Sequence, residues 1–179
     1  MLVFGVIVLL GMAVVKSSRD ETIGVDPQGT QAYYAESSMK SKPNYSRGVY
    51  TGQKYECVEY VRRWWIKNRS ATFDPIDSAI ELIHLSKAKS IHKYNQFYPV
   101  RSALNDTPEV GDLVIFKPSP ENGYYGHVAI VVRVLPEEVH IAEQNRTNEK
   151  WKEDYSRSIP VVNHTLQDSE IIEVRRLVK

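Results

Sequence analysis

Cysteine is almost absent from this chain. The 179 residues contain a single one, Cys57. One thiol excludes an internal disulfide and a zinc site built from cysteines. Cys57 is therefore either a small apolar residue of the core or a reactive thiol.

An excess of charge of either sign is also lacking. The chain has 23 Lys and Arg residues against 22 Asp and Glu residues, a formal net charge of +1. Nucleic-acid binding needs many basic residues on one face, so we expect no nucleic-acid partner. The GxGxxG and P-loop patterns are missing too, and we expect neither a cofactor nor a bound metal ion.

The one long apolar run is too short for a comfortable membrane span. Residues 2–15 carry no charge, whereas a bilayer span needs about 20 apolar residues. We interpret residues 1–16 as a hydrophobic signal or membrane anchor, and we expect a membrane-anchored or exported chain that touches the membrane through this segment. Lys16 and Arg19 follow the run and favour a cytoplasmic domain as the alternative. The oligomeric state is left open.

The rest of the chain is long enough for one hydrophobic core. Residues 17–44 are polar and lack periodicity, which predicts a linker, and residues 45–179 are predicted to form a single domain. Apolar spacings of three and four predict a helix over 57–68, and a second helix is expected after Pro75. Runs of β-branched residues predict strands over 112–117, 127–135, 139–144, 158–162 and 171–178, after an irregular stretch over 91–108. Helices followed by an antiparallel sheet indicate an α+β fold.

Three side chains far apart in the sequence have the chemistry of a cysteine hydrolase. Cys57 stands in the first turn of the predicted helix, where free backbone N–H groups stabilise a thiolate. His127 begins a predicted strand directly after Gly126, and Glu143 ends the next one. A thiolate that attacks, an imidazole that moves the proton and a carboxylate that orients the ring complete the set.

The hairpin that carries His127 and Glu143 must satisfy a geometric condition. The two side chains share a face only if the connection has an odd number of residues or a bulge shifts the register, because a slip of one residue turns every side chain over. We expect a three-residue turn over 135–137. That turn places Asn145 opposite His127 and leaves Glu143 within diagonal reach.

Four blocks of sequence carry a resemblance to a known family. They are residues 52–64 (GQKYECVEYVRRW), 111–116 (GDLVIF), 126–130 (GHVAI) and 141–145 (IAEQN). In order and spacing they resemble the CHAP domain, the cysteine- and histidine-dependent amidohydrolase/peptidase family, and in particular the amidase domains of glutathionylspermidine synthetase/amidase and trypanothione synthetase. The resemblance implies a papain-like fold with N-terminal helices packed on an antiparallel β-sheet. It also implies Cys57 as nucleophile, His127 as general base and then acid, and Glu143 as the residue that orients the imidazole.

The resemblance further implies hydrolysis of an amide through a thioester, in a glutathionylspermidine-like or related small peptide conjugate. The positions it implies for substrate binding are Glu56, Arg62, Ile76, Asp77, Ser78, Ala79 and Asn145. Glu56 departs from the family pattern, in which Gln precedes the cysteine, and an ionised carboxylate would repel an oxyanion that Gln would bind. Two alternatives stay open: a peptidoglycan amidase or endopeptidase, and a catalytically inactive CHAP-fold binding module.

Overall fold

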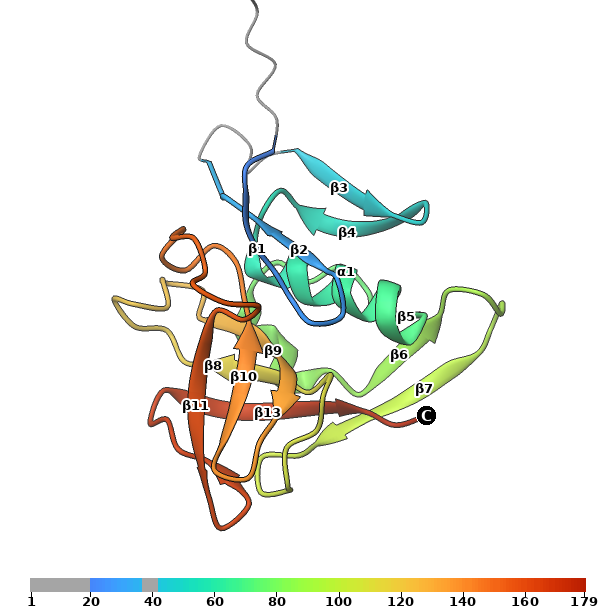
Figure 1. The fold of residues 1–179 in the computed structure, drawn as a ribbon. Coiled ribbons are helices and arrows are strands. Elements are labelled where there is room, and N and C mark those ends of the chain that lie inside the picture. Colours follow the sequence, from blue (N-terminus) through green and yellow to red (C-terminus); the bar gives the residue numbers. More distant parts are fainter. Residues whose placement is uncertain (1–19, 37–41) are drawn as a thin grey trace, which may run out of the picture.

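Antiparallel strands dominate the computed structural model, which describes residues 20–36 and 42–179 (Figure 1). A nine-stranded sheet has the order β12-β11-β10-β9-β8-β13-β7-β6-β5, and the hairpins β1–β2 and β3–β4 form two small sheets of their own. The strands are β1 Thr22–Val25, β2 Gln31–Tyr33, β3 Pro43–Ser46, β4 Val49–Gln53, β5 Ala71–Thr72, β6 Lys87–Ser90, β7 Phe97–Ser102, β8 Leu113–Phe116, β9 His127–Val134, β10 Glu138–Ala142, β11 Arg157–Val162, β12 Thr165–Leu166 and β13 Ile171–Leu177. The five predicted strands and the antiparallel sheet are confirmed.

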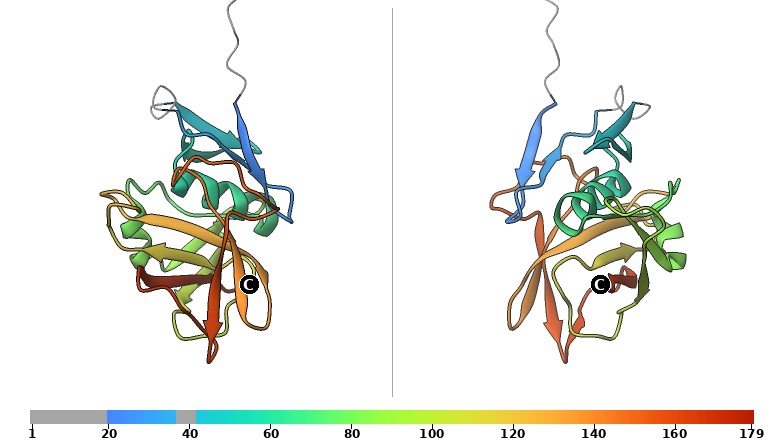
Figure 2. Two further views of the ribbon diagram at one scale, coloured as in Figure 1. Left: turned by 60° about the vertical axis from the view of Figure 1, so that its left-hand side comes forward. Right: turned by 90° about the vertical axis from the view of Figure 1, so that its right-hand side faces the viewer.

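The predicted first helix is present as α1, Cys57–Arg69, and ends at Ser70 in a left-handed conformation. Its first ten residues are all buried, including the charged side chains of Glu59, Arg62 and Arg63. The two small hairpins lie on one side of α1 and the large sheet lies on the other (Figures 1 and 2). The helix is therefore enclosed on more than the single apolar face that its sequence spacing indicates.

The large sheet has apolar side chains on both faces. One cluster joins Trp64 and Trp65 of α1 to Leu113 and Ile130 of the central strands. A second cluster contains the alternate side chains of the same strands, among them Phe116, and is completed by β10 and β11. Successive residues of a strand point to opposite faces of the sheet. The continuous apolar runs of β8 and β9 therefore fill both buried faces.

The structure corrects the linker prediction for residues 17–44. In the described part of that range, β1 and β2 pair, and Ile23 and Ala32 belong to the core. The hydroxyl of Tyr60 in α1 donates a 2.8 Å hydrogen bond to Asp26, which lies between these strands. Strands of four and three residues contain too few apolar positions for periodicity to show.

The predicted second helix is also corrected. Residues after Pro75 form a single short 3₁₀ helix, η2, Ala79–His84. The stretch over 91–108 is not wholly irregular, because it contains β7, which pairs with β6 and β13. Apolar spacing alone does not distinguish a 3₁₀ turn from an α-helix over six residues.

The predicted signal or anchor over 1–16 lies outside the described residues and stays a prediction. Within residues 20–36 and 42–179, no helix is both long enough and apolar enough to cross a membrane.

Candidate active site

The start of α1 determines where Cys57 lies. Glu56 precedes the helix with extended backbone angles and makes no side-chain cap, so the helix begins at Cys57 itself. The first backbone N–H groups of a helix have no acceptor within it and attract negative charge. The Cys57 side chain is 8% exposed and lies at the wall of a cavity of about 650 Å³.

Gly52 allows the strand before α1 to approach the helix closely. Its φ of +143° is in a region that residues with a side chain rarely adopt, and a Cβ placed there would lie 3.0 Å from the Cβ of Glu59. A larger residue would push α1 away from β4. The close approach of β4 to the first turn of α1 therefore depends on this glycine.

The β9–β10 hairpin meets its geometric condition by a bulge and not by the expected three-residue turn. Leu135 N–H donates to Glu138 O, which closes a turn with an even number of residues. The register then shifts between His140 and Ile141, so that Ile141 lies opposite Val131. This shift of one residue places Glu143 on the face of the sheet that holds His127.

His127 contacts Glu143 and lines the same cavity as Cys57. Its Nε2 lies 3.0 Å from Glu143 Oε2, which leaves Nδ1 as the ring nitrogen available to Cys57. Burial by itself lowers the pKa of His127, but the negative charge of Cys57 and the hydrogen bonds to Cys57 and Glu143 outweigh burial and raise the pKa to about 9. An imidazolium is thus favoured at neutral pH.

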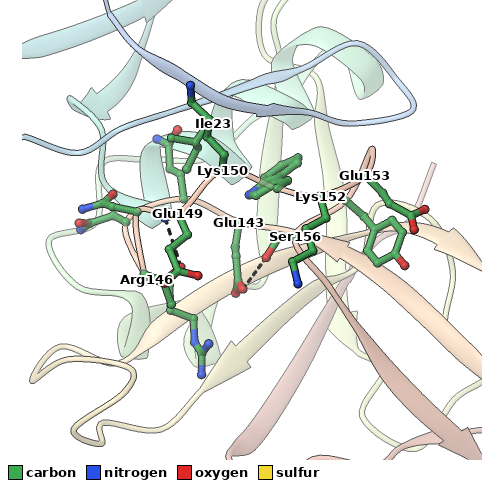
Figure 3. Close-up of a pocket in the computed structure, with 14 residues that line it drawn as sticks. Ile23, Glu143, Arg146, Glu149, Lys150, Lys152, Glu153 and Ser156 are labelled. Atoms are coloured by element: carbon green, nitrogen blue, oxygen red, sulfur yellow. Dashed lines mark hydrogen bonds between the residues drawn. The ribbon is translucent and has the colours of Figure 1, made fainter.

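Glu143 is held in place by two residues that the sequence did not single out. Its Oε1 accepts hydrogen bonds from Ser156 Oγ at 2.7 Å and from Arg157 Nε at 3.0 Å (Figure 3 shows the bond to Ser156). Burial alone would raise the pKa of Glu143, yet the hydrogen bond and charge of His127, the charge of Arg157 and the Ser156 hydroxyl lower it well below the usual range. Glu143 therefore stays a carboxylate beside the imidazole.

The cavity beside Cys57 gathers most of the residues predicted to bind substrate. Glu56, Ile76, Asp77, Ser78, Ala79 and Asn145 line it together with Cys57 and His127. The loop before β9 forms another wall, where Tyr124 and Tyr125 are 90% and 68% exposed.

Arg62 does not line this cavity. It is 1% exposed and donates to the backbone oxygens of Thr51 and Asp74 at 3.0 and 2.7 Å. Burial lowers its pKa to about 10. In this structure Arg62 ties β4 to the segment before η2 and does not present its guanidinium to the cavity.

Glu56 points toward Asn145 across the cavity wall. Asn145 Nδ2 donates a short hydrogen bond to Glu56 Oε2, and Asn145 itself adopts a φ of 60°. The neighbouring Gln144 also reaches this place, because its Nε2 donates to the backbone oxygen of Glu56 at 3.0 Å and to Glu59 Oε2 at 2.8 Å. The segment after β10 is thus joined to the start of α1 by side-chain hydrogen bonds.

A buried ion pair of α1 lies next to these hydrogen bonds. Arg63 Nε donates to Glu59 Oε1 at 2.7 Å, and Asn44 of β3 donates to the same oxygen at 2.9 Å. Sequence reasoning missed this network, because nothing in the spacing of α1 marks Glu59 and Arg63 as inward-facing.

Within the described residues, no group of three His, Cys, Asp or Glu side chains could hold a metal ion.

Comparisons with known proteins identify a family that matches more than half of this chain. The family described as CHAP domain matches residues 48–145. Trypanothione synthetase of Crithidia fasciculata is 32% identical over 111 residues, which cover 60% of this chain and 17% of the relative. Glutathionylspermidine synthase of the same organism is 30% identical over 132 residues, 67% of this chain and 17% of the relative.

A bacterial relative matches over a longer part of the chain. The bifunctional glutathionylspermidine synthetase/amidase of Escherichia coli (strain K12) is 26% identical over 165 residues, which cover 82% of this chain and 26% of the relative. The chain therefore spans only between 17% and 26% of the length of these relatives.

Proposed function

Because this chain belongs to the CHAP domain family, as its four sequence blocks indicated, we propose that it is a cysteine-dependent amidohydrolase. Cys57 is the nucleophile, His127 is the general base and acid, and Glu143 orients the imidazole. The observation that carries this proposal is the position of the buried His127, whose Nε2 lies 3.0 Å from Glu143 Oε2 and which lines the same cavity as Cys57. We propose in addition that the α1-and-sheet arrangement is a papain-like fold.

The reaction follows from the two nitrogens of one ring. The Cys57 proton passes to Nδ1 of His127, and the sulfur attacks the carbonyl carbon of the substrate amide. As the C–N bond breaks, the imidazolium returns that proton to the departing amine and leaves a thioester. Water then attacks the thioester while His127 takes its proton. The C–S bond breaks, the imidazolium returns the proton to the sulfur, and the carboxylic acid leaves, which completes the cycle.

The negative charge that develops on the carbonyl oxygen needs donors near the start of α1. The backbone N–H of Cys57 has no acceptor within the helix and is available for this task. Glu56 supplies a carboxylate where the family pattern has an amide, but its Oε2 accepts from Asn145. That hydrogen bond directs the Glu56 charge toward the asparagine.

The substrate that we propose is a glutathionylspermidine-like or related small peptide conjugate. Two observations support it: the names of two relatives include glutathionylspermidine, and the cavity presents charges of both signs. Asp77 and Glu121 supply carboxylates and Arg146 supplies a guanidinium. A conjugate with a carboxylate on one part and ammonium groups on the other matches this distribution.

The test compares the protein with variants of its nucleophile and base. Hydrolysis of glutathionylspermidine should be lost in Cys57→Ala and His127→Gln and retained in His92→Gln, which removes an exposed histidine from a different loop. Cleavage by the Cys57→Ala protein would refute the mechanism. Release of peptide from purified sacculi with no action on glutathionylspermidine would instead assign the chain to peptidoglycan.

An inactive binding module would behave differently again. Its thiol should react with iodoacetamide no faster than a free cysteine across pH 5 to 8, whereas a thiol paired with an imidazolium should react rapidly well below pH 8.

A further inference from the structure

Arg146 is the only arginine or lysine among the described residues that line the catalytic cavity. Its Nε is buried and has no hydrogen-bond partner within the described part of the chain. The Nε of Arg62 is also buried without a partner, but the other two nitrogens of Arg62 donate to backbone oxygens. A buried donor without a partner is unfavourable unless another molecule satisfies it.

The place of Arg146 follows from the segment after β10. It is the next residue after Asn145, whose side chain is fixed to Glu56 beside the nucleophile. Figure 3 shows the Arg146 side chain extending away from the other side chains around a smaller cavity of about 320 Å³ behind Glu143. Arg146 lines both cavities.

Arg62 was the residue expected to bind a substrate carboxylate, and it is already occupied by two backbone oxygens. Arg146 is free of such partners among the described residues and keeps the planar donor set that binds a carboxylate through two hydrogen bonds. We propose that Arg146 is the residue that recognises the free carboxylate of the substrate. This inference rests on the proposed function for the identity of the cavity, but its test does not need catalysis.

The test measures binding in the Cys57→Ala background by calorimetry. The probes are glutathionylspermidine, whose glutamyl part carries a free carboxylate, and the same compound with that carboxylate converted to a carboxamide. The carboxylate compound should bind about 10- to 100-fold more tightly, the range expected for hydrogen bonds between charged groups. Arg146→Gln should remove this preference and leave the affinity for the carboxamide unchanged.

Two further variants separate recognition from structure. Arg146→Lys keeps the charge but loses the planar pair of donors, so it should retain only part of the preference. Lys152→Gln removes an exposed cation from the same loop that does not line the catalytic cavity, and it should leave the preference intact.

Three results would overturn the inference: equal binding of both probes by the parent protein, an unchanged preference in Arg146→Gln, or an equal loss of affinity for both probes in that variant. Failure of the proposed function is distinct. It would appear as selective binding of the carboxylate compound with no hydrolysis by the protein that retains Cys57.

Discussion

Replacing Glu143 with glutamine removes the negative charge beside His127 while nearly preserving the shape of the side chain. In the parent protein Ser156 and Arg157 donate to Glu143 Oε1, and His127 Nε2 lies 3.0 Å from Oε2. The amide oxygen of the glutamine should take the place of Oε1, because only an oxygen accepts from these two donors. The NH₂ group then faces the imidazole, where a protonated ring cannot accept a hydrogen bond.

The magnitude follows from the pKa of His127. Burial lowers this pKa, and the charges and hydrogen bonds of Cys57 and Glu143 raise it from 6.5 to about 9. At 1.36 kcal/mol per pKa unit, the net rise means that the folded protein stabilises the protonated ring over the neutral ring by about 3 kcal/mol. Cys57 contributes the larger part of the upward effect, so Glu143→Gln should lower the His127 pKa by at least about 1, the lower end of the effect of one nearby opposite charge.

The assay is an NMR titration of the imidazole Cε1–H signals between pH 5 and 10.5. The alkaline limb of kcat/KM for glutathionylspermidine should move to lower pH by the same amount, because activity needs the imidazolium to protonate the leaving amine. Glu138→Gln is the matched control, since it removes the carboxylate that lies 2.9 Å from His140 on the same strand. A His127 midpoint in Glu143→Gln at or above that of the parent protein would refute this reasoning.

Three further predictions concern stability and rate. The pKa of Glu143 is lower in the folded protein than the ordinary value of 4.5, so its contribution to stability is present above about pH 4.5 and is lost as the pH falls. The free energies of unfolding of the parent protein and Glu143→Gln, measured in urea, should therefore converge between pH 6 and pH 3. Their difference should shrink by at most about 1.4 kcal/mol per pH unit. Glu56→Gln should raise kcat, by roughly 10-fold if an oxyanion donor is gained, and an unchanged or lower kcat would contradict the role given to this position. Gly126→Ala should destabilise the fold by at least about 1 to 3 kcal/mol, because φ is +71° and the new Cβ would lie 2.7 Å from the oxygen of Phe116. Gly123→Ala, with φ of +74° and no atom within 4 Å, separates backbone strain from this collision, and equal losses in denaturation would contradict the steric argument.

Local patterns in the sequence were sufficient for the elements that position the nucleophile and the base. The helix begins at Cys57 because apolar side chains recur there at intervals of three and four, and β9 begins at His127 because β-branched residues follow it. The short strands β1 and β2 were not predictable, because only Ile23 and Ala32 mark them as part of the core.

The candidate site, like the fold, was predictable from the sequence only in part. Cys57, His127 and Glu143 could be selected by chemistry and family resemblance, but the contact between His127 and Glu143 depends on a bulge between β9 and β10. No residue type in β9 or β10 signals that bulge, because a register shift belongs to the pairing of two strands and not to either strand alone. Whether Arg62 or Arg146 faces the cavity likewise depends on which neighbours occupy each guanidinium.

The available chemistry can be read from the residues alone: one thiol at the start of a helix, a histidine at the start of a strand, and a carboxylate sixteen residues later. The charge and orientation of His127 and Glu143 depend on the folded arrangement around them. The Ser156 and Arg157 donors that hold Glu143, and the burial around it, come from the segment that leads into β11. Their effect depends on distances of about 3 Å through a low-dielectric interior, which only the pairing and packing of the strands establish.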